Sequence, residues 1–225
     1  MKRWMSLLMC AALAAPAWAL DLAGLTQGEA AGGLKEALTQ GAGKAVELLG
    51  QKNGYLANPK VKIPLPDALA KSESLLQMMG KGKDLDKLVA TMNRAAEQAV
   101  PAAKPLLMDA IKTMSVDDAK RILSGGEDSV TRYFKEKTES QLATLFEPMV
   151  KEQTDSLAVS KTYNKLAGTG AGLGLVKQED TRVEGYVTRK ALDGLYLMIA
   201  EQEKAIRKDP VGAAGALARR VFGAL

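Results

Sequence analysis

The chain has 225 residues, of which 47% are hydrophobic and 25% charged, and its 31 Lys and Arg against 26 Asp and Glu give a formal net charge of +5. It contains no histidine and one cysteine, Cys10, which excludes Ser-His-Asp and Cys-His catalysis and removes the usual ligands of zinc, haem, copper and iron–sulfur sites. We therefore expect no cofactor and no metal, and the small positive balance does not indicate nucleic-acid binding.

The first residues have the pattern of a secretory signal peptide. Lys2 and Arg3 precede an apolar stretch that is too short to span a membrane, and Ala17-Trp18-Ala19 forms a small-x-small cleavage site. We therefore expect cleavage after Ala19 and export to the periplasm. The alternative, a lipoprotein signal at Cys10, fits less well because Cys10 lies inside the apolar stretch and follows Met9.

Cleavage would divide the chain into a signal peptide, 1–19, and a mature protein, 20–225, that has no cysteine and hence no disulfide. Loss of Lys2 and Arg3 lowers the basic count from 31 to 29 and the net charge to about +3. About 206 residues are enough for one sizeable core, and we expect a single domain. No later stretch is apolar enough to span a membrane.

Ala, Leu, Lys and Glu dominate the mature chain, and their spacing predicts a series of amphipathic helices. The first is expected over 33–50, with Gly41 and Gly43 weakening its middle. Three prolines then exclude a regular helix over 55–66, which we expect to be a surface arm or a short edge strand.

A second helix is predicted from Pro66 or Asp67 to about Met79, where a run of glycine and lysine ends it. A third begins near Asp84, and Pro101 can serve as the first residue of the next helix. Ser115-Val116-Asp117-Asp118 resembles a capping box and predicts a short helix that ends at Leu123.

A long helix is expected from Asp128 or Ser129, with a kink or break caused by Pro148. The Gly-rich stretch 167–176 predicts a mobile loop. A last long helix is expected over 181–208, where Asp209-Pro210 ends it and begins a final short helix. The chain is therefore predicted to be all-α, with about seven or eight helices in one domain.

Two glycine-rich stretches raise the question of phosphate binding. The stretch GTGAGLG at 168–174 fits neither the dinucleotide fingerprint nor a P-loop, because its glycines have the wrong spacing and no Lys-Ser/Thr follows. In SGGEDSVTRYF at 124–134, two acids occupy the positions that an anion would use at the start of the next helix. We therefore interpret it as a corner between helices. Capping does not explain Thr131, Arg132 and Tyr133, which are candidates for a partner surface.

A second candidate surface consists of Asn93, Arg94 and Glu97, which share one side of the third predicted helix. These side chains could line a polar pocket, but an ion pair that helps to dock another segment is the more common role. Glu203 and Arg207 are four residues apart, with the acid first, and predict an ordinary helix ion pair.

The adjacent acids of the chain do not indicate catalysis. Asp117 with Asp118 and Glu127 with Asp128 each lie at a predicted helix start, where free backbone N–H groups stabilise carboxylates. Glycosidase chemistry needs two acids across a cleft, and a calcium loop needs alternating oxygen ligands. We therefore predict no catalytic, cofactor-binding or metal-binding residue.

An ordered series of stretches resembles the uncharacterised bacterial family called domain of unknown function 4197. The resemblance implies an exported helical protein and brings no activity, and it does not extend over 167–184. The stretches that carry it are GLKEALTQG at 33–41, VKIPLPDAL at 61–69, MNRAAEQAV at 92–100, DAIKTMSVDDAKRIL at 109–123, SGGEDSVTRYF at 124–134, FEPMVKEQTD at 146–155, YVTRKALDGLYLMIAEQEKAIRKDP at 186–210 and VFG at 221–223.

Three functions remain open. The first is a non-enzymatic envelope protein that binds another protein or an apolar small molecule in a cavity or groove. The second is a carboxylate-type hydrolase that acts on an envelope polymer, which requires two acids facing each other and a raised pKa. The third is peripheral membrane contact through a terminal amphipathic helix that includes Arg219, Arg220, Val221, Phe222 and Leu225.

Overall fold

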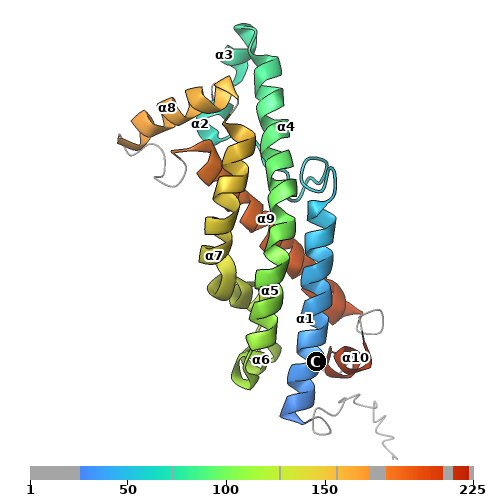
Figure 1. Ribbon diagram of the computed structural model, residues 1–225. Coiled ribbons are helices and arrows are strands. Elements are labelled where there is room, and N and C mark those ends of the chain that lie inside the picture. Colours follow the sequence, from blue (N-terminus) through green and yellow to red (C-terminus); the bar gives the residue numbers. More distant parts are fainter. Residues whose placement is uncertain are drawn as a thin grey trace, which may run out of the picture.

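The computed structural model of the protein describes residues 26–71, 73–126, 128–155, 157–172, 181–209 and 215–222. These residues are helical apart from turns and one extended segment, which confirms the predicted all-α fold (Figure 1). The predicted signal peptide and its cleavage site lie outside the described residues.

Eight of the described helices have seven residues or more. The elements in chain order are α1 (Gln27–Gly50), α2 (Asp67–Ala70), α3 (Glu73–Met78), α4 (Gly82–Ala99), the 3-10 helix η2 (Val100–Ala102), α5 (Ala103–Thr113), α6 (Val116–Leu123), α7 (Ser129–Thr154), α8 (Ala158–Gly172), α9 (Val183–Lys208) and α10 (Ala216–Phe222).

The helices form an elongated bundle around α9, which packs against α7, α1 and α4 (Figure 1). Helices α4 and α5 follow one another through η2 as one column, and α3 and the start of α4 make one end of the molecule. Helix α10 packs on α1 towards the opposite end. One core of buried apolar side chains connects these helices, and its largest members include Leu34, Leu49, Leu88, Met92, Leu107, Phe134, Leu142 and Phe146.

Helix α1 begins at Gln27, six residues before the predicted start, because Thr26 and Glu29 form a capping box. The Thr26 Oγ1 accepts the Glu29 N–H at 3.2 Å, and the Glu29 Oε2 accepts the Thr26 N–H at 2.9 Å. This reciprocal pairing satisfies backbone donors that have no partner within the helix. The predicted capping box of Ser115 and Asp118 at the start of α6 is confirmed.

The segment 51–66 is an arm that forms neither helix nor strand, so the edge-strand alternative is wrong for it. Tyr55 and Ile63 are buried, and the Tyr55 hydroxyl donates a 2.6 Å hydrogen bond to the Ala191 carbonyl in α9. A Cβ atom on Gly194 would lie 2.7 Å from the Tyr55 Cε1, so this glycine allows the arm to approach α9 closely.

Three predicted features of the helices are corrected. The expected helix 67–79 is divided into α2 and α3, and η2 joins α4 to α5 where Pro101 was expected to begin a separate helix. Helix α7 continues through Pro148 to Thr154, so of the predicted kink or break the break is wrong. Helix α8 extends to Gly172, so the first part of the predicted Gly-rich loop is helical, and 173–180 lie outside the described residues.

Candidate functional site

Three glutamates, Glu97, Glu184 and Glu203, are buried, and each pairs with an arginine that is close to it in the chain. A buried carboxylate is costly unless it is paired and hydrogen-bonded, so burial of this kind marks either a functional group or a structural anchor. The partners of each glutamate decide between these roles.

Glu97 of α4 holds the arm at residues 53–56. Its Oε1 accepts the backbone N–H groups of Tyr55 and Leu56, each at 3.1 Å, and its Oε2 accepts the Asn53 N–H at 3.2 Å. Arg94 donates to the Glu97 Oε2 at 2.5 Å and to the Asn53 Oδ1 at 2.8 Å. Asn53 has a positive φ of 71°, so the carboxylate also stabilises a turn in the left-handed backbone region, which residues other than glycine rarely adopt.

Asn93, one turn before Glu97, pairs with the arm as another strand would. Its Oδ1 accepts the Ile63 N–H and its Nδ2 donates to the Ile63 carbonyl, both at 2.8 Å. The Nδ2 also donates to the Val89 carbonyl in its own helix. The structure therefore brings the candidate residues Asn93, Arg94 and Glu97 together, but they face the arm and line neither of the two hollows described below.

Glu203 fastens the end of α9 to the corner between α6 and α7. Its Oε1 accepts two hydrogen bonds from Arg207, at 3.0 and 2.9 Å, as the four-residue spacing predicted. Arg207 also donates to the Ile122 carbonyl and to the Ser129 Oγ, each at 3.4 Å, and Ser129 donates to the same carbonyl at 2.9 Å. The corner SGGEDS is therefore closed by side chains, as its interpretation as a helix–helix corner requires.

Burial, helped by the negative charge of Asp128, raises the pKa of Glu203 to about 6. The Arg207 guanidinium and the backbone N–H of Val130 lower this pKa without cancelling the effect of burial. A raised carboxyl pKa is typical of a general acid, but Glu203 lines neither hollow and is bound to Arg207. Its position favours a structural role.

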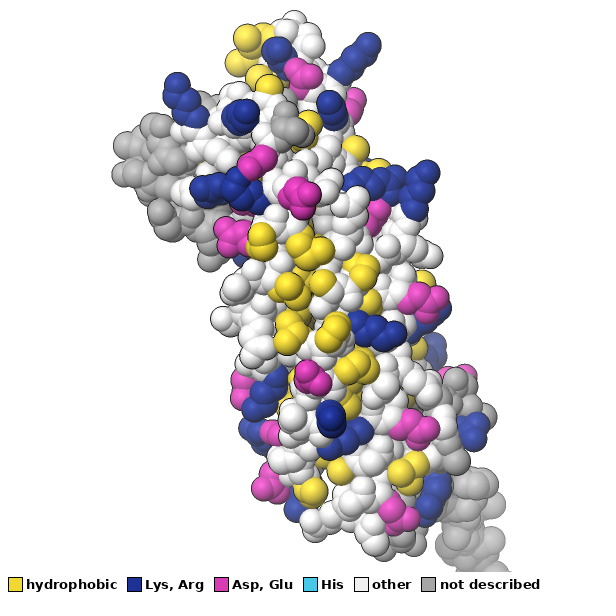
Figure 2. All heavy atoms as spheres, viewed as in Figure 1, with side chains coloured by type: hydrophobic (Ala, Val, Ile, Leu, Met, Phe, Trp, Pro, Cys, Tyr) yellow, Lys and Arg dark blue, Asp and Glu magenta, His cyan; other side chains and the backbone are white. Residues whose placement is uncertain are grey.

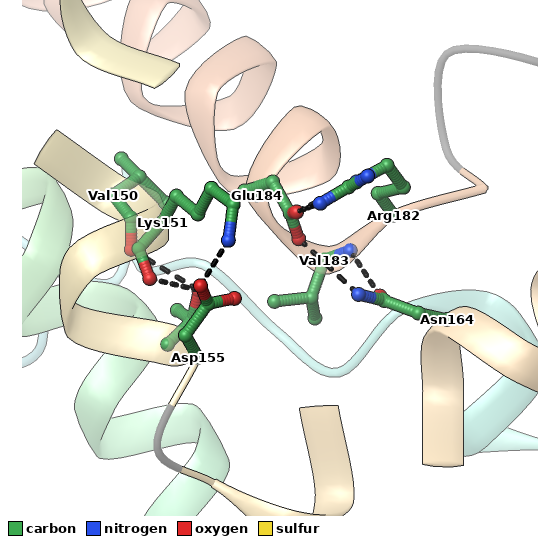
Figure 3. A network of polar contacts seen from close by, with 8 residues as sticks. Val150, Lys151, Asp155, Asn164, Arg182, Val183 and Glu184 are labelled. Carbon is green, nitrogen blue, oxygen red and sulfur yellow. Dashed lines mark hydrogen bonds and ion pairs between the residues drawn. The ribbon is translucent and has the colours of Figure 1, made fainter. Parts of the chain in front are cut away.

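Glu184 joins α8 to the start of α9 (Figure 3). Arg182 approaches its carboxylate from one side, with Nε 2.6 Å from Oε1, and Asn164 of α8 lies on the other with Nδ2 3.4 Å from Oε2. The Asn164 Oδ1 also accepts the Val183 N–H at 2.8 Å, and thus binds a free donor of the first turn of α9. The sequence carries no signal for this group, because Arg182 and Glu184 do not have helical spacing and Asn164 is distant in the chain.

The three candidate residues at the start of α7, Thr131, Arg132 and Tyr133, differ in how far they are buried. Tyr133 is buried, and its hydroxyl donates to the Ala110 carbonyl at 2.6 Å, while burial raises the pKa of this phenol to about 12. The Thr131 hydroxyl is buried and has no hydrogen-bond partner among the described residues. Arg132 is exposed and lies 3.4 Å from Asp128 in a helix ion pair. Of the three, Arg132 alone presents its charge to solvent, beside a hollow of about 270 Å³.

Of the adjacent acids, Asp118 is placed as capping predicts. Asp118 accepts the Ser115 N–H and hydroxyl and is paired with Arg121, and the Ser115 hydrogen bonds lower the pKa of Asp118 to about 2. Asp128 is the N-cap residue of α7, although its side chain makes no capping hydrogen bond. Glu127 lies outside the described residues.

The larger hollow is an open groove of about 590 Å³ between α1, α5 and the end of α9, which we call the α1–α9 groove. Met108, Ala205 and Ile206 supply its apolar surface. Four charged residues lie around it: Lys44 is paired with Glu47 at 3.2 Å, Asp209 also has a partner, and Lys104 has no ion pair with any described residue. The remaining lining residues are Thr39, Gln40, Gly41, Gly43 and Gln202.

Two glycines of α1 contribute backbone to this groove, and packing does not require either of them. A Cβ atom on Gly41 would make ordinary contacts, 3.4 Å from the Gln202 Cβ and 3.6 Å from the Ile206 Cδ1. A Cβ atom on Gly43 would meet nothing within 4 Å. Each glycine inside a helix costs about 0.5–1 kcal/mol relative to alanine. The glycines therefore keep the groove open and its helical backbone accessible at some cost in stability.

Among the described residues, no group of three or more Asp, Glu or Cys side chains is arranged to hold a metal ion. None of the helices in the same part of the chain has the length and apolar character needed to cross a membrane.

A comparison with protein families gives one match, to the family described as "Protein of unknown function (DUF4197)", over residues 24–223. Neither a curated protein nor a solved structure matches the chain.

Proposed function

Because the chain belongs to the DUF4197 family of proteins of unknown function, we propose from its own geometry that it is an exported, non-enzymatic binding protein of the bacterial envelope. Its proposed site is the α1–α9 groove, and its proposed ligand is an amphiphile with an apolar chain and an anionic head. Export and a periplasmic location rest on the signal-peptide pattern of residues 1–19.

The observation that carries this proposal is the pair of glycines that packing does not explain. Gly41 and Gly43 both line the groove, and the space above Gly43 is open. A volume of about 590 Å³ is within the range of small-molecule sites. A ligand chain that lies against the helix backbone would account for both the missing side chains and the stability that they cost.

The charges of the groove favour an anionic head. Lys44 lies 3.2 Å from Glu47, whereas Lys104 is exposed and has no carboxylate partner among the described residues. An anionic group that binds Lys104 would leave the apolar part of the ligand against Met108 and Ile206. The hydrolase alternative gains no comparable support, because the buried acid with a raised pKa, Glu203, is bound to Arg207.

Native mass spectrometry of the protein purified from its own periplasm tests the proposal. We expect a retained small amphiphile on the wild-type protein and on Gly28→Leu, which adds the same side chain to α1 at a position with no atom within 4 Å and outside the groove. We expect Gly43→Leu to fold and to lose the ligand, since its side chain would fill the groove. A wild-type protein with no bound molecule, or a Gly43→Leu variant that keeps it, would show that the groove is not the site.

A further inference from the structure

Three large apolar side chains are exposed together at one end of the molecule. Leu75 is 57% exposed, Met78 79% and Met79 65%, and α3, which carries the first two, buries no residue. Leu76, which follows Leu75 in α3, packs against the core. Helix α3 therefore has an inner apolar contact and a second apolar side that the described chain leaves uncovered. We call residues 75–83, LLQMMGKGK, the α3–α4 tip.

The α3–α4 tip is a defined turn. The Lys81 N–H donates to the Leu76 carbonyl at 2.8 Å and the Gly80 N–H donates to the Gln77 carbonyl at 2.9 Å, with a φ of 78° at Gly80. This is the Schellman pattern, in which the residue after the glycine is usually apolar and contacts the end of the helix. Here that residue is Lys81, so the turn places a cation next to Met78 and Met79.

The charge of the tip has one sign. Residues 75–83 contain Lys81 and Lys83 and no acid. The nearest acids in the chain are Glu73, which accepts a hydrogen bond from Gln77, and Asp84, which lies 3.5 Å from Lys81 in an exposed pair. Exposed pairs of this kind are weak, so Lys81 remains able to bind another anion.

The shape of the tip suits a surface better than a pocket. Figure 2 shows hydrophobic side chains at the protruding end of the molecule formed by α3 and the start of α4, with both basic and acidic side chains close to them. Apolar side chains beside lysines are typical of segments that enter the interface of a membrane with anionic lipids. Three large apolar side chains exposed together also differ from the singly scattered exposure that is ordinary for monomers.

The C-terminal helix, which the sequence made the candidate for membrane contact, is occupied differently. Ala218 and Val221 of α10 are fully buried, and a Cβ atom on Gly33 of α1 would lie 2.6 Å from the Val221 Cγ2. Arg220 of α10 lies 3.8 Å from Glu29 of α1. The side of α10 that carries Val221 thus covers α1, whereas no described residue covers the apolar side of α3.

We propose that the α3–α4 tip inserts into the interface of an anionic lipid bilayer, with Leu75, Met78 and Met79 among the acyl chains and Lys81 and Lys83 at the head groups. The protein is then attached to the membrane by one end. The α1–α9 groove is formed by α1, α5 and α9 and includes no residue of the tip, so it remains open to solvent.

The absence of tryptophan from residues 20–225 makes the test direct, since both tryptophans of the chain lie in the predicted signal peptide. In the mature protein, Met79→Trp places one fluorophore at the tip, and Leu197→Trp places one at another exposed apolar position on α9. With phosphatidylglycerol-containing vesicles we expect a blue shift of emission for Met79→Trp and none for Leu197→Trp. Neutral phosphatidylcholine vesicles should produce a much smaller shift, because they do not attract the lysines.

Vesicle flotation of unlabelled protein gives a second measurement. We expect the double variant Met78→Ser and Met79→Ser to bind anionic vesicles at least tenfold more weakly than the wild type, while Leu197→Ser binds as the wild type does. Equal flotation of the tip variant and the wild type, or unchanged emission of Met79→Trp, would overturn the proposal. A dimer in vesicle-free buffer that the tip variant loses would also overturn it, because the tip would then bind a second copy.

Discussion

At the scale of the residue, Glu203 is a buried acid whose pKa differs between the folded and unfolded chain. Its pKa is about 6 in the folded protein and about 4.5 when unperturbed. The folded state therefore binds the proton more tightly, and this contribution to stability is complete below pH 4.5 and is lost as the pH rises through 6. A shift of this size corresponds to about 2 kcal/mol of the free energy of unfolding.

The variant Glu203→Gln cannot titrate at this position, so it isolates the effect. We expect the free energy of unfolding of the wild type, minus that of Glu203→Gln, to fall by about 1.5 kcal/mol between pH 4.5 and pH 6.5. Urea denaturation at several pH values measures this difference, because other groups titrate alike in both proteins. A difference that stays level or rises with pH would mean that Arg207 stabilises the carboxylate more than burial destabilises it.

Asn93 provides the second prediction at this scale. Asn93→Ala removes the donor and the acceptor that pair with Ile63 and leaves a buried N–H and a buried carbonyl unsatisfied. Each such group costs about 1–3 kcal/mol, so we expect a loss of several kcal/mol of unfolding free energy in urea. Gln77→Ala is the control, since Gln77 is exposed on a helix, and we expect a change within about 0.5 kcal/mol. An equally small effect at Asn93 would show that the arm is not anchored there.

At the scale of the element, α10 depends on a glycine of another helix. A Cβ atom on Gly33 would lie 2.7 Å from the Leu217 carbonyl oxygen as well as against Val221, so Gly33→Ala must displace α10. We expect faster hydrogen exchange over residues 216–222 and a lower melting temperature. Gly43→Ala on the same helix meets no atom, and we expect it to raise the free energy of unfolding by about 0.5–1 kcal/mol. If both variants stabilise the protein, α10 is not packed on α1 in solution.

Local signals predicted the elements well, and the contacts between them poorly. The capping box at Ser115, the ion pair of Glu203 with Arg207 and the corner after α6 each depend on residues within a few positions of one another. The capping box of Thr26 was equally readable, since Thr-x-x-Glu stands in the sequence. Glycine misled in α8, where the Gly-rich stretch is helical as far as Gly172, and Pro148 does not break α7.

The candidate site was predictable only in part, for the same reason. Spacing placed Asn93, Arg94 and Glu97 on one side of a helix, but their partners lie 30 to 44 residues away in an arm without periodicity. The α1–α9 groove arises from three helices that come together only in the fold, and Gly41 and Gly43 looked like mere weak points of α1. Long-range pairing of this kind has no signature in a single sequence.

At the scale of the whole molecule, the buried acids connect parts of the chain that regular packing leaves weakly attached. Glu97 binds the arm, Glu203 the corner before α7, and Glu184 the junction of α8 with α9. A chain with a single cysteine, and therefore no internal disulfide, and with no histidine gains order at these places from charged hydrogen bonds. When the buried acid or its partner is removed, we expect the attached segment to open locally while the core stays folded.

Helix α8 is the part of the molecule where we expect local opening most readily. It lies at the side of the bundle, and Asn164 binds it to α9 (Figures 1 and 3). Asn164→Ala removes the hydrogen bonds to Glu184 and to the Val183 N–H. We expect hydrogen–deuterium exchange to accelerate over 158–172, while exchange in the middle of α7 and α9 stays as in the wild type.

The matched control is Thr162→Ala, which changes an exposed residue of α8 whose hydroxyl bonds only within the helix, to the Ala158 carbonyl. We expect no acceleration there, because α8 keeps its connection to Val183 and Glu184. If Asn164→Ala instead accelerates exchange equally in α7, α8 and α9, then α8 unfolds with the core as one cooperative unit. In that case the junction at Glu184 stabilises the whole molecule and not one helix of it.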